Sequence, residues 1–436
     1  MKIGILGTGW VGLVTGNCLA NIGNDVTFYD IDEDKINSLN KQICPIYEPG
    51  LQELIIKNKR NTIYTTNPEE AIKDKDVLFI TVGTPSNEEG AVDLKYIKQI
   101  SKTIAENLNP QNFCLILNKS TSPPEALEII DEEIKKIEEI KNLSFDYEIG
   151  CCPETLAEGT AIKDFSNPDR IIVGVKSEMA RGLIQKLFRP YTLNQAEIIF
   201  IGPKEASLAK YASNTHLAAR VVVTNAIAQI ARKYNVNTRE IMKAVGKDKR
   251  IGQKFLHPSI GFGGSCFGKD VQALAFLSKQ KDLPGSILLY EIINSNISHT
   301  EHLITDLIDH FKNLENKKIT ILGTAFKANV SDTRDSPAHR LIYSLLNLNA
   351  NVVVYDPKAI EETKKEFGDK IVYAENEEVA VENSNALIIA TEWDVFRGLN
   401  LEKIKSKMLD YPFFGDYRAL YNKKEVEDFG FRYFSV

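Results

Sequence analysis

Short apolar runs alternate with helical stretches over residues 1 to about 203. Turn or helix-capping residues follow each run, as they do at the ends of β-strands. This alternation predicts an α/β fold in which a parallel sheet is wound with helices on both faces. The predicted strands are Lys2–Leu6, Asp25–Tyr29, Val77–Thr81, Phe113–Asn118 and Ile171–Val175.

The next part of the chain has a different pattern. Residues 204–245 contain neither glycine nor proline, and small or apolar residues recur there at helical spacing. The pattern predicts at least one long helix, and helical character continues with interruptions to about Asn313. The residues on this stripe are Leu208, Ala212, Thr215, Ala219, Val222, Ala226 and Ile230.

Strand-like runs return at Ile319–Leu322, Val352–Tyr355 and Ala386–Thr391, with helical segments between them. They predict a second, smaller α/β domain. We therefore predict two Rossmann-like parallel-sheet domains joined by a central long-helix region. The predicted boundaries are 1–203, 204–313 and 314–436.

Length and charge narrow the class of protein. With 436 residues, at roughly 100–200 residues per domain, the chain has room for two or three domains, which excludes a small disulfide-stapled scaffold. The 53 basic and 59 acidic residues give a net charge of −6, and no run of five or six Lys/Arg occurs. We expect a small-molecule partner rather than nucleic acid or a membrane. No apolar stretch reaches the roughly 18 residues that a membrane span needs.

A glycine-rich turn follows the first predicted strand. It reads Gly7-Thr8-Gly9-Trp10-Val11-Gly12 and opens a helix that extends to about Ile22. The first glycine allows the tight turn, the second allows the backbone to approach a pyrophosphate, and the third allows helix and strand to pack closely. Amides at the helix start would bind the phosphates. Because this stretch supplies the first strand and the turn, we interpret the N-terminus as mature, cytoplasmic protein rather than a signal peptide.

An acidic residue completes this motif. Asp30 ends the next predicted strand, 18 residues after Gly12. Its carboxylate would bind the adenosine ribose hydroxyls and repel a 2′-phosphate, so NAD is favoured over NADP. Lys35 would lie near the adenosine end or simply be a solvated helix residue; spacing alone leaves both interpretations open.

Three polar pairs are separated by four residues, so each would share one face of a helix if its segment is helical. They are Glu154 with Glu158, Lys210 with Asn214, and Cys266 with Asp270. For any one pair, an ordinary polar helix face is the simpler explanation.

The six cysteines form no CxxC pair and no Cys/His spacing suited to zinc, so we expect no metal site. Five are interpreted as structural thiols. Cys266 differs because it lies in the glycine-rich run Gly261-Phe262-Gly263-Gly264-Ser265-Cys266-Phe267-Gly268-Lys269-Asp270. Backbone amides and Lys269 would favour its thiolate and make it nucleophilic. A thiol combined with an NAD site suggests aldehyde oxidation through a thiohemiacetal and a thioester.

Nearly the whole chain resembles the UDP-glucose/GDP-mannose dehydrogenase family. The run from Gly261 to Asp270 is the most specific of the motifs that carry the resemblance. The others are Gly7–Gly12, Tyr47-Glu48-Pro49-Gly50-Leu51, Val82-Gly83-Thr84-Pro85, Lys119-Ser120-Thr121, Glu158-Gly159-Thr160-Ala161, Asn167-Pro168-Asp169-Arg170, Phe326-Lys327, and Asp332-Thr333-Arg334 with Ser336.

The resemblance implies a four-electron oxidation of a sugar C6 alcohol to a carboxylate, with two NAD reduced in sequence. It implies an N-terminal NAD-binding domain, a central region that forms a homodimer, and a C-terminal nucleotide-sugar-binding domain. Positions matching family contacts with NAD are Gly7, Gly9, Val11, Gly12, Asp30, Lys35, Thr84, Thr121, Glu158, Lys269 and Arg334. Positions matching the surroundings of the nucleotide sugar are Glu154, Thr155, Leu156, Ala157, Glu158, Lys210, Asn214, Arg250, Phe255, Leu256, His257, Pro258, Ser259, Gly263, Phe326, Lys327 and Arg418.

The resemblance also assigns catalytic roles. Asp270, with Lys210 and a water, would help to remove the hydroxyl proton, while Lys210 and Asn214 would stabilise charge on the oxygen. Cys266 would add to the aldehyde. The water that hydrolyses the thioester would be activated by Glu154, Glu158 or Asp270, and Thr121 completes the catalytic set. Arg250 would serve the neighbouring subunit's site.

Two positions depart from the family pattern. Thr155 replaces a common phenylalanine, and Tyr417 replaces a common glycine beside Arg418. UDP-glucose is the expected substrate, with a UDP-N-acetyl-hexosamine or GDP-mannose as alternatives. A two-electron hydroxyacid-type dehydrogenase and a non-enzymatic binding protein are the competing classes. The turn at Gly323–Lys327 lacks GxGxxG, so one dinucleotide site per chain is expected.

Overall fold

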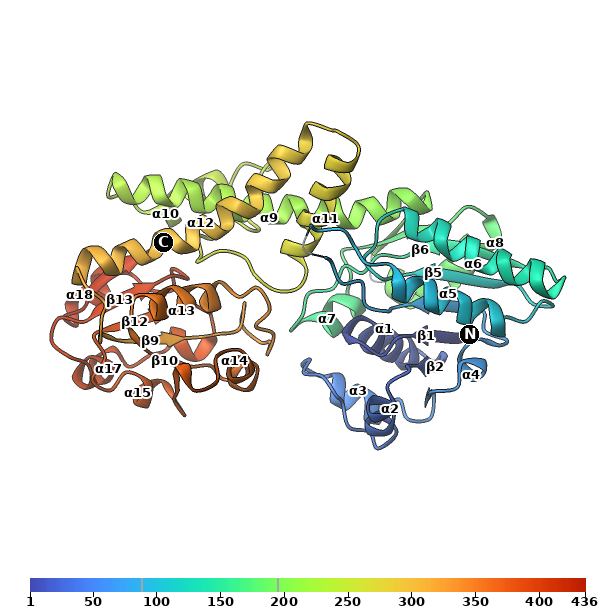
Figure 1. Cartoon of the computed structure of the whole chain (residues 1–436), viewed down its shortest axis with the longest axis horizontal. Coiled ribbons are helices and arrows are strands. Elements are labelled where there is room, and N and C mark those ends of the chain that lie inside the picture. The colour runs from blue at the N-terminus through green and yellow to red at the C-terminus, as the bar shows by residue number, and fades with distance from the viewer. Residues whose placement is uncertain (88, 194–195) are drawn as a thin grey trace. The chain divides into compact units, whose positions relative to one another are not determined.

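A computed structural model describes residues 1–87, 89–193 and 196–436. The chain divides into two compact units, Met1–Ser213 and Asn214–Val436. Each unit contains one sheet with its covering helices (Figure 1). The predicted fold class, two parallel-sheet α/β parts and a long helix, is confirmed.

The first unit contains an eight-stranded sheet in the order β3-β2-β1-β4-β5-β6-β7-β8. All neighbouring strands run parallel except β6 and β7, which pair antiparallel at Cys151 and Gly174. Its elements are β1 (Lys2–Leu6), α1 (Trp10–Asn21), β2 (Asp25–Tyr29), α2 (Glu33–Asn40), α3 (Leu51–Lys57), β3 (Thr62–Thr65), α4 (Pro68–Ile72), β4 (Val77–Ile80), α5 (Lys95–Asn107), β5 (Cys114–Asn118), α6 (Glu125–Lys141), β6 (Tyr147–Cys151), α7 (Ala161–Ser166), β7 (Arg170–Gly174), α8 (Glu178–Thr192), β8 (Glu197–Ile201) and the start of α9 (Pro203–Lys233).

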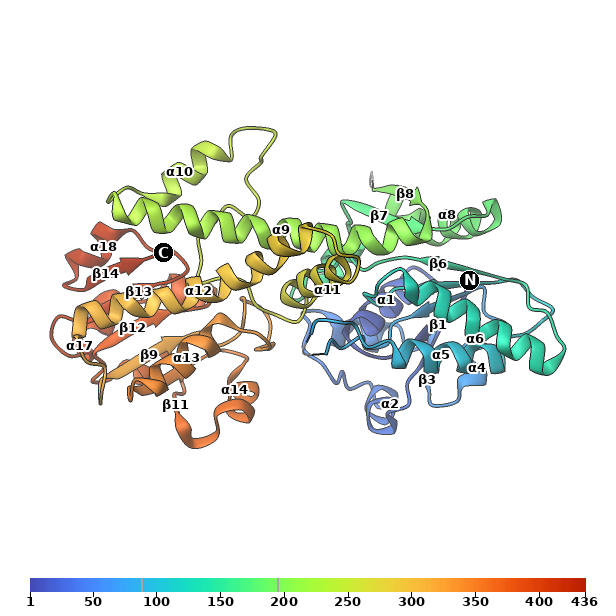
Figure 2. The ribbon, with the colours of Figure 1, turned by 45° about the horizontal axis from the view of Figure 1, so that its top comes forward.

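Two apolar cores lie on the two faces of this sheet. Alternate residues of a strand point to opposite faces, so Val77 and Phe79 pack with α1 and α8 while Leu78 and Ile80 pack with α5 and α6. Helices α5 and α6 lie side by side over the second core (Figure 2). Because both faces are covered, β1, β4 and β5 are largely apolar runs, and the sequence predicts them. The inner strand β6 has half-exposed positions and was not predicted.

The second unit contains a six-stranded parallel sheet in the order β11-β10-β9-β12-β13-β14. The rest of α9 also belongs to this unit. Its other elements are α10 (Thr238–Val245), α11 (Phe267–Gln280), α12 (Gly285–Phe311), β9 (Lys318–Leu322), α13 (Pro337–Asn347), β10 (Asn351–Tyr355), α14 (Ile360–Phe367), the 3-10 turn Gly368–Lys370, β11 (Val372–Tyr373), α15 (Glu377–Ala380), β12 (Ala386–Ile389), α16 (Asp394–Arg397), α17 (Leu401–Lys407), β13 (Phe413–Asp416), α18 (Lys423–Asp428) and β14 (Arg432–Ser435).

The glycine-free segment 204–245 is not one helix. Helix α9 ends at Lys233, and α10 begins at Thr238, with Asn237 accepting a hydrogen bond from the Arg239 amide. Asn235 between them has φ = 53°, a left-handed conformation that asparagine tolerates better than most residues. An asparagine therefore ends the long helix where the sequence offers neither glycine nor proline.

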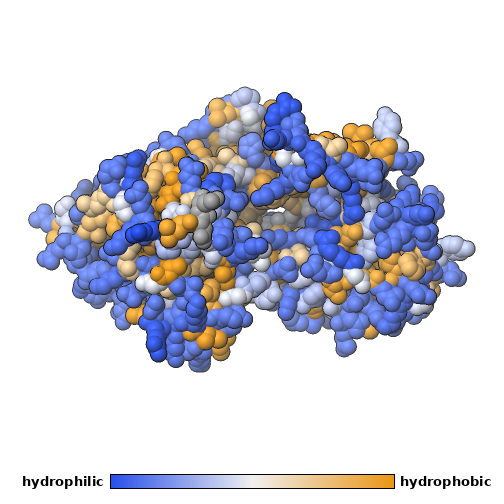
Figure 3. Space-filling model, turned by 180° about the vertical axis from the view of Figure 1, so that it is seen from behind, coloured by the Kyte–Doolittle hydropathy of each residue, from blue (hydrophilic) through white to orange (hydrophobic). Residues whose placement is uncertain are grey.

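Apolar side chains are mostly inside the two units. Hydrophilic residues predominate on the face shown in Figure 3, and apolar residues there form separate patches. Across the described residues, no helix combines the length and the apolar character needed to cross a bilayer.

Two histidines are buried in the second unit. His299 on α12 bonds through Nε2 to the Ser259 carbonyl (2.8 Å) and through Nδ1 to Gln229 (2.7 Å). His339 on α13 lies edge-on to the Phe367 ring. Burial lowers the pKa of each imidazole to about 4. Both rings are therefore neutral in the folded protein at neutral pH.

We expect the free energy of unfolding to fall as the pH drops from 6.5 toward 4. In this window His299 and His339 become protonated in the unfolded chain but stay neutral in the folded chain. Each histidine therefore lowers the free energy of unfolding by up to about 1.4 kcal/mol per pH unit. Urea denaturation at pH 7, 6 and 5 measures the slope. His339→Gln should reduce the slope, whereas His302→Gln, a change at an exposed ring, should not; equal slopes in both variants would contradict the prediction.

Candidate active site

The glycine-rich turn follows β1 and is built for a phosphate group. Gly7 has φ = 112°, and a Cβ on Gly12 would lie 2.0 Å from the Gly7 carbonyl oxygen, so a larger residue cannot occupy position 12. Gly9 caps α1, and a Cβ there would meet no described atom within 4 Å. Space is thus available beside the first amides of α1, where the helix dipole favours an anion.

Asp30 is held against this turn. Its Oδ2 accepts hydrogen bonds from the amide and the hydroxyl of Thr8 (2.7 and 2.6 Å). The turn and the half-buried acid together fit the pyrophosphate and the adenosine ribose of NAD. Lys35 is on α2, where its ammonium group pairs with Asp32 at 3.3 Å.

The other cofactor candidates of this unit also follow strands. Thr84 comes after β4 and Thr121 after β5, and the Thr84 hydroxyl donates to the Thr121 carbonyl (2.7 Å). The carboxyl ends of parallel strands meet at one sheet edge, where open α/β sheets bind their ligands. Gly7, Asp30, Thr84 and Thr121 are thereby brought to the same edge.

Glu154 and Glu158 do not share a helix face, because residues 152–157 form a loop. The Glu154 carboxylate accepts a hydrogen bond from the Leu156 amide (2.8 Å), a local bond that competes with helix formation. Its other oxygen forms a buried ion pair with Lys210 on α9. Within the loop, Thr155 and Ala157 are exposed and Glu158 is half-buried.

Glu48 is a residue whose role the sequence did not reveal. Its carboxylate is 5% exposed and accepts hydrogen bonds from the Trp10 indole (2.9 Å) and from the amides of Gly159 (2.8 Å) and Ala161 (2.9 Å). It therefore ties the start of α1 to the segment that follows Glu158. Burial raises the pKa of the Cys18 thiol to about 12, with a further contribution from the negative charge of Glu48.

In the second unit, Cys266 caps helix α11 and its side chain is exposed. Asp270 lies in the first turn of that helix and donates its amide to the Cys266 carbonyl (2.9 Å). The Asp270 side chain is 1% exposed, and its Oδ2 accepts a hydrogen bond from Asn214 on α9 (2.6 Å). This arrangement places an accessible thiol at a helix N-terminus, one turn from a buried carboxylate. The other cysteines are buried or half-buried thiols, as predicted.

The glycines before Cys266 allow close packing. A Cβ on Gly263 would lie 2.6 Å from the Asp335 carbonyl oxygen. Gly264 has φ = 82°, a Cβ there would lie 2.8 Å from the Phe326 ring, and its amide donates to the Arg334 carbonyl (2.8 Å). These contacts bring the cysteine segment together with the Phe326 ring and the backbone of Arg334.

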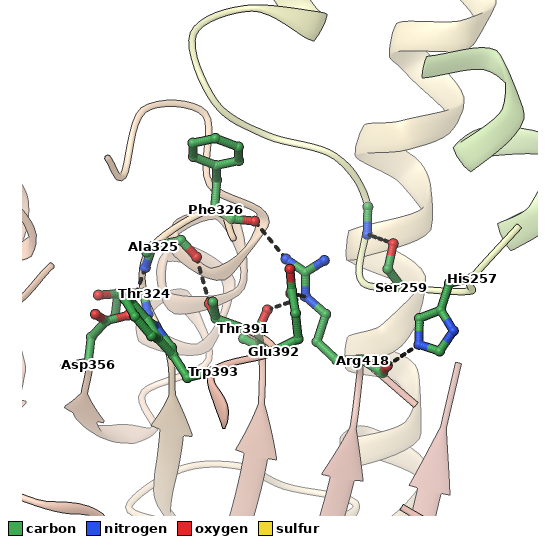
Figure 4. A network of polar contacts seen from close by, with 12 residues as sticks. His257, Ser259, Thr324, Ala325, Phe326, Asp356, Thr391, Glu392, Trp393 and Arg418 are labelled. Atoms are coloured by element: carbon green, nitrogen blue, oxygen red, sulfur yellow. Dashed lines mark hydrogen bonds and ion pairs between the residues drawn. The ribbon is translucent and has the colours of Figure 1, made fainter. Parts of the chain in front are cut away.

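Arg418 is 8% exposed and follows β13 (Figure 4). Its Nε donates to the Ala390 carbonyl (2.8 Å), its Nη2 donates to the Phe326 carbonyl (2.7 Å), and Glu392 pairs with it at 3.1 Å. The Arg418 carbonyl contacts His257 Nε2 (2.8 Å). Arg418 therefore connects the loop carrying Phe326 and Lys327 to the segment that contains His257.

The sequence matches three domains described for one family. They are the NAD binding domain (residues 1–192), the central domain (204–297) and the UDP binding domain (320–423) of the UDP-glucose/GDP-mannose dehydrogenase family. UDP-glucose 6-dehydrogenase TuaD of Bacillus subtilis is 37% identical over 100% of this chain and 93% of its own length. The chain belongs to the UDP-glucose/GDP-mannose dehydrogenase family.

Solved structures of this family have the same fold. A UDP-glucose dehydrogenase from Pyrobaculum islandicum superposes with a TM-score of 0.89 at 28% identity, covering 99% of this chain and 98% of that one. A UDP-D-ManNAc dehydrogenase from Pyrococcus horikoshii gives a TM-score of 0.84 at 27% identity, with coverages of 100% and 99%. The family assignment confirms the resemblance, and with it NAD as the cofactor.

Two of the candidate cations pair with acids two residues earlier in the chain. The Arg250 side chain is 88% exposed and pairs with Asp248, which is two residues away. Arg334 pairs with Asp332 in the same manner. Phe255, with φ = 63°, is also exposed. The role of Arg250 in a neighbouring subunit's site therefore stays a prediction.

The second unit repeats the turn but not its accessible acid. Asp356 follows β10 as Asp30 follows β2, and its Oδ2 accepts from the amides of Thr324 (2.8 Å) and Ala325 (3.0 Å) and from the Trp393 indole (3.2 Å). Asp356 is 2% exposed, so its carboxylate is committed to internal bonds (Figure 4). The burial of Asp356 supports the expectation of one dinucleotide site in this dehydrogenase, which stays a prediction.

We expect Glu48→Gln to lower the free energy of unfolding by about 1–3 kcal/mol, because an amide cannot accept all three buried hydrogen bonds. Urea denaturation measures the change. Glu53→Gln is the matched control: it removes the same charge from an exposed position on α3 and should stay within about 0.5 kcal/mol of the unmodified protein. Equal costs for the two variants would show that the three bonds contribute nothing.

Proposed function

We propose that the protein is an NAD-dependent UDP-glucose 6-dehydrogenase, which oxidises the C6 alcohol of UDP-glucose to the carboxylate of UDP-glucuronate. The observation that carries the proposal is the exposed Cys266 thiol at the start of α11, one turn from the buried Asp270–Asn214 pair. A thiol that adds to the aldehyde gives the covalent intermediate from which the second hydride leaves, and a two-electron dehydrogenase has no use for such a thiol. The substrate is inferred from the relatives named above.

In this proposal, three parts of the chain have different functions. Residues 1–203 bind NAD, residues 204–313 form the central helical region, and residues 314–436 bind the nucleotide. The glycine-rich turn, Asp30, Thr84 and Thr121 hold the cofactor. Bound NAD would accept one hydride in each oxidation.

In the first oxidation, Asp270 accepts the C6 hydroxyl proton through a water. Lys210 and Asn214, one turn apart on α9, stabilise the negative charge that develops on the oxygen. The burial of Lys210 supports this role, since a cation shielded from water interacts more strongly with that charge. The product of this step is an aldehyde.

In the second oxidation, the Cys266 thiolate forms a bond to the aldehyde carbon and gives a thiohemiacetal. Loss of a hydride converts it to a thioester. Water activated by a carboxylate of the set Glu154, Glu158 and Asp270 then cleaves the carbon–sulfur bond, releasing the acid and the thiol. Together with the first oxidation, one UDP-glucose, two NAD and one water give one UDP-glucuronate, two NADH and three protons.

The protein acts as a cytoplasmic homodimer in this proposal. Helix α9 supports self-association because it carries exposed apolar side chains: Leu208 is 42%, Val223 57% and Ile230 59% exposed. Burying such side chains against a second copy would remove them from water.

We expect two NADH per UDP-glucose consumed. The NADH absorbance at the end of a reaction limited by UDP-glucose gives the ratio directly. Exposed Thr155, in the loop that would face the sugar, makes UDP-N-acetylmannosamine the most informative competitor, with GDP-mannose as a second. One NADH per substrate would overturn the four-electron reaction, and turnover of a competitor alone would overturn the choice of UDP-glucose.

Cys266→Ala should reduce formation of UDP-glucuronate by about a thousandfold or more, because no other group supplies the covalent intermediate. Product analysis by chromatography measures it. Cys44→Ala, which removes a half-buried thiol of the first unit, is the matched control and should keep its activity. Substantial acid formation by Cys266→Ala would rule out the thioester route.

A further inference from the structure

The second unit contains a cavity of about 540 Å³ that carries several positive charges. Arg239 and Lys243 on α10, Lys247 just after that helix, and Arg397 on α16 line it. No acidic residue is among the described residues that line it. In a chain of net charge −6, this is a locally cationic site.

The three cations of the α10 segment are arranged unusually. Arg239, Lys243 and Lys247 are four residues apart, so like charges follow one another along one side, which destabilises a helix. None of the three forms an ion pair with any residue that the structure describes, whereas the fourth cation of the cavity, Arg397, pairs with Asp394 at 3.6 Å. On α14, by contrast, Lys364 and Lys365 pair with acids three residues earlier. An unneutralised row of cations along a cavity indicates an anionic ligand.

The positive charge affects a neighbouring side chain as well. Burial lowers the pKa of His257, and the nearby charges of Arg239, Arg397 and Arg418 lower it further. A hydrogen bond from His257 to the Arg418 carbonyl acts in the opposite direction. The combined field of the arginines therefore reaches the cavity wall that His257 forms.

Apolar side chains form another part of the wall. Met242 and Pro258 are buried, and Leu256 and Leu420 are half-buried. The cavity is within the roughly 300–1,000 Å³ range of small-molecule sites. A ligand with a flat apolar body could contact the apolar residues, and its negative charges could contact the cations. A nucleoside polyphosphate has a flat base and a charged phosphate chain.

A neighbouring cavity of about 520 Å³ shares Arg239 but lacks this character. Its Arg232 is bound by both carboxylate oxygens of Asp306, at 2.6 and 2.7 Å. The charge of Arg232 is thereby neutralised and Lys423 lies 3.9 Å from Glu427, so the cavity beside α10, with its row of unpaired cations, is the stronger candidate.

We propose that the cavity beside α10 binds a nucleoside polyphosphate at a site separate from those for NAD and for the nucleotide sugar. Its cations are absent from the positions assigned to either ligand. The segment Leu256–Pro258 lines this cavity and is also a candidate for holding the nucleotide sugar, so occupancy is expected to change the KM for UDP-glucose. This last consequence rests on the proposed function; binding itself does not.

Calorimetric titration of the full-length chain with ATP tests the proposal. Saturating UDP-glucose and NADH are present to block the other two sites, and EDTA removes divalent cations. We expect one ATP per chain, weaker binding as salt is added, measurable binding of tripolyphosphate and none of adenosine. Absence of ATP binding under these conditions would overturn a separate site, and so would ATP binding that appears only when UDP-glucose is left out.

Matched variants localise the binding. Arg239→Gln/Lys243→Gln/Lys247→Gln should weaken ATP binding by about tenfold or more, from the summed loss of three charge interactions near the surface. Lys364→Gln/Lys365→Gln/Lys370→Gln removes the same charge from exposed positions outside the cavity and should bind ATP normally. Turnover without ATP should be unchanged in both triple variants, which shows that they fold. If both triple variants lost ATP binding equally, the loss would come from the change in net charge. That result would overturn the placement of ATP in this cavity.

Discussion

The parallel arrangement of the strands is the constraint on which both halves of the protein depend. When neighbouring strands run the same way, the loops that leave their carboxyl ends gather along one sheet edge. In the first unit this brings together Gly7, Asp30 and Thr84, which lie far apart in the sequence. In the second unit the same rule gathers the loops after β9, β12 and β13, and thereby Phe326, Glu392 and Arg418. Candidate site residues that are far apart in the sequence therefore lie at one sheet edge because the strands are parallel.

Buried carboxylates then fix neighbouring segments of the chain against one another. Burying a charged group is costly unless it is paired or hydrogen-bonded, so each buried acid restricts the positions of its partners. Glu48 fixes the start of α1 and the segment at Gly159, and Asp270 fixes α11 against Asn214. The positions of these donors are thus determined by the acids and not by the flexibility of the loops.

The sequence predicts those parts of the fold that depend on local pattern. Strands covered on both faces, such as β1 and β4, are apolar runs and were located within a residue. The edge strands β3, β8, β11 and β14 escaped prediction because half-exposed positions interrupt the pattern. The inner strands β6 and β13 were missed as well, β6 because its first three positions are half-exposed and β13 because its run FFGD is short and contains a glycine. Glu48 escaped for another reason: its partners Gly159 and Ala161 are 111 and 113 residues away, so no local spacing signals the contact. The spacing of Glu154 and Glu158 was misleading because a bond from the Leu156 amide to Glu154 favours a loop.

The two glycine-containing turns show how one architecture supports two tasks. In both, a threonine amide donates to the aspartate that ends the next strand: Thr8 to Asp30, and Thr324 to Asp356. The difference is what covers the acid. The Trp393 indole bonds to Asp356 and helps to bury it, whereas Asp30 stays half-exposed and accessible to a ribose. The amides of Ala325, Lys358 and Ala359 also bond to Asp356, so the aromatic ring and these amides together make this carboxylate a structural one.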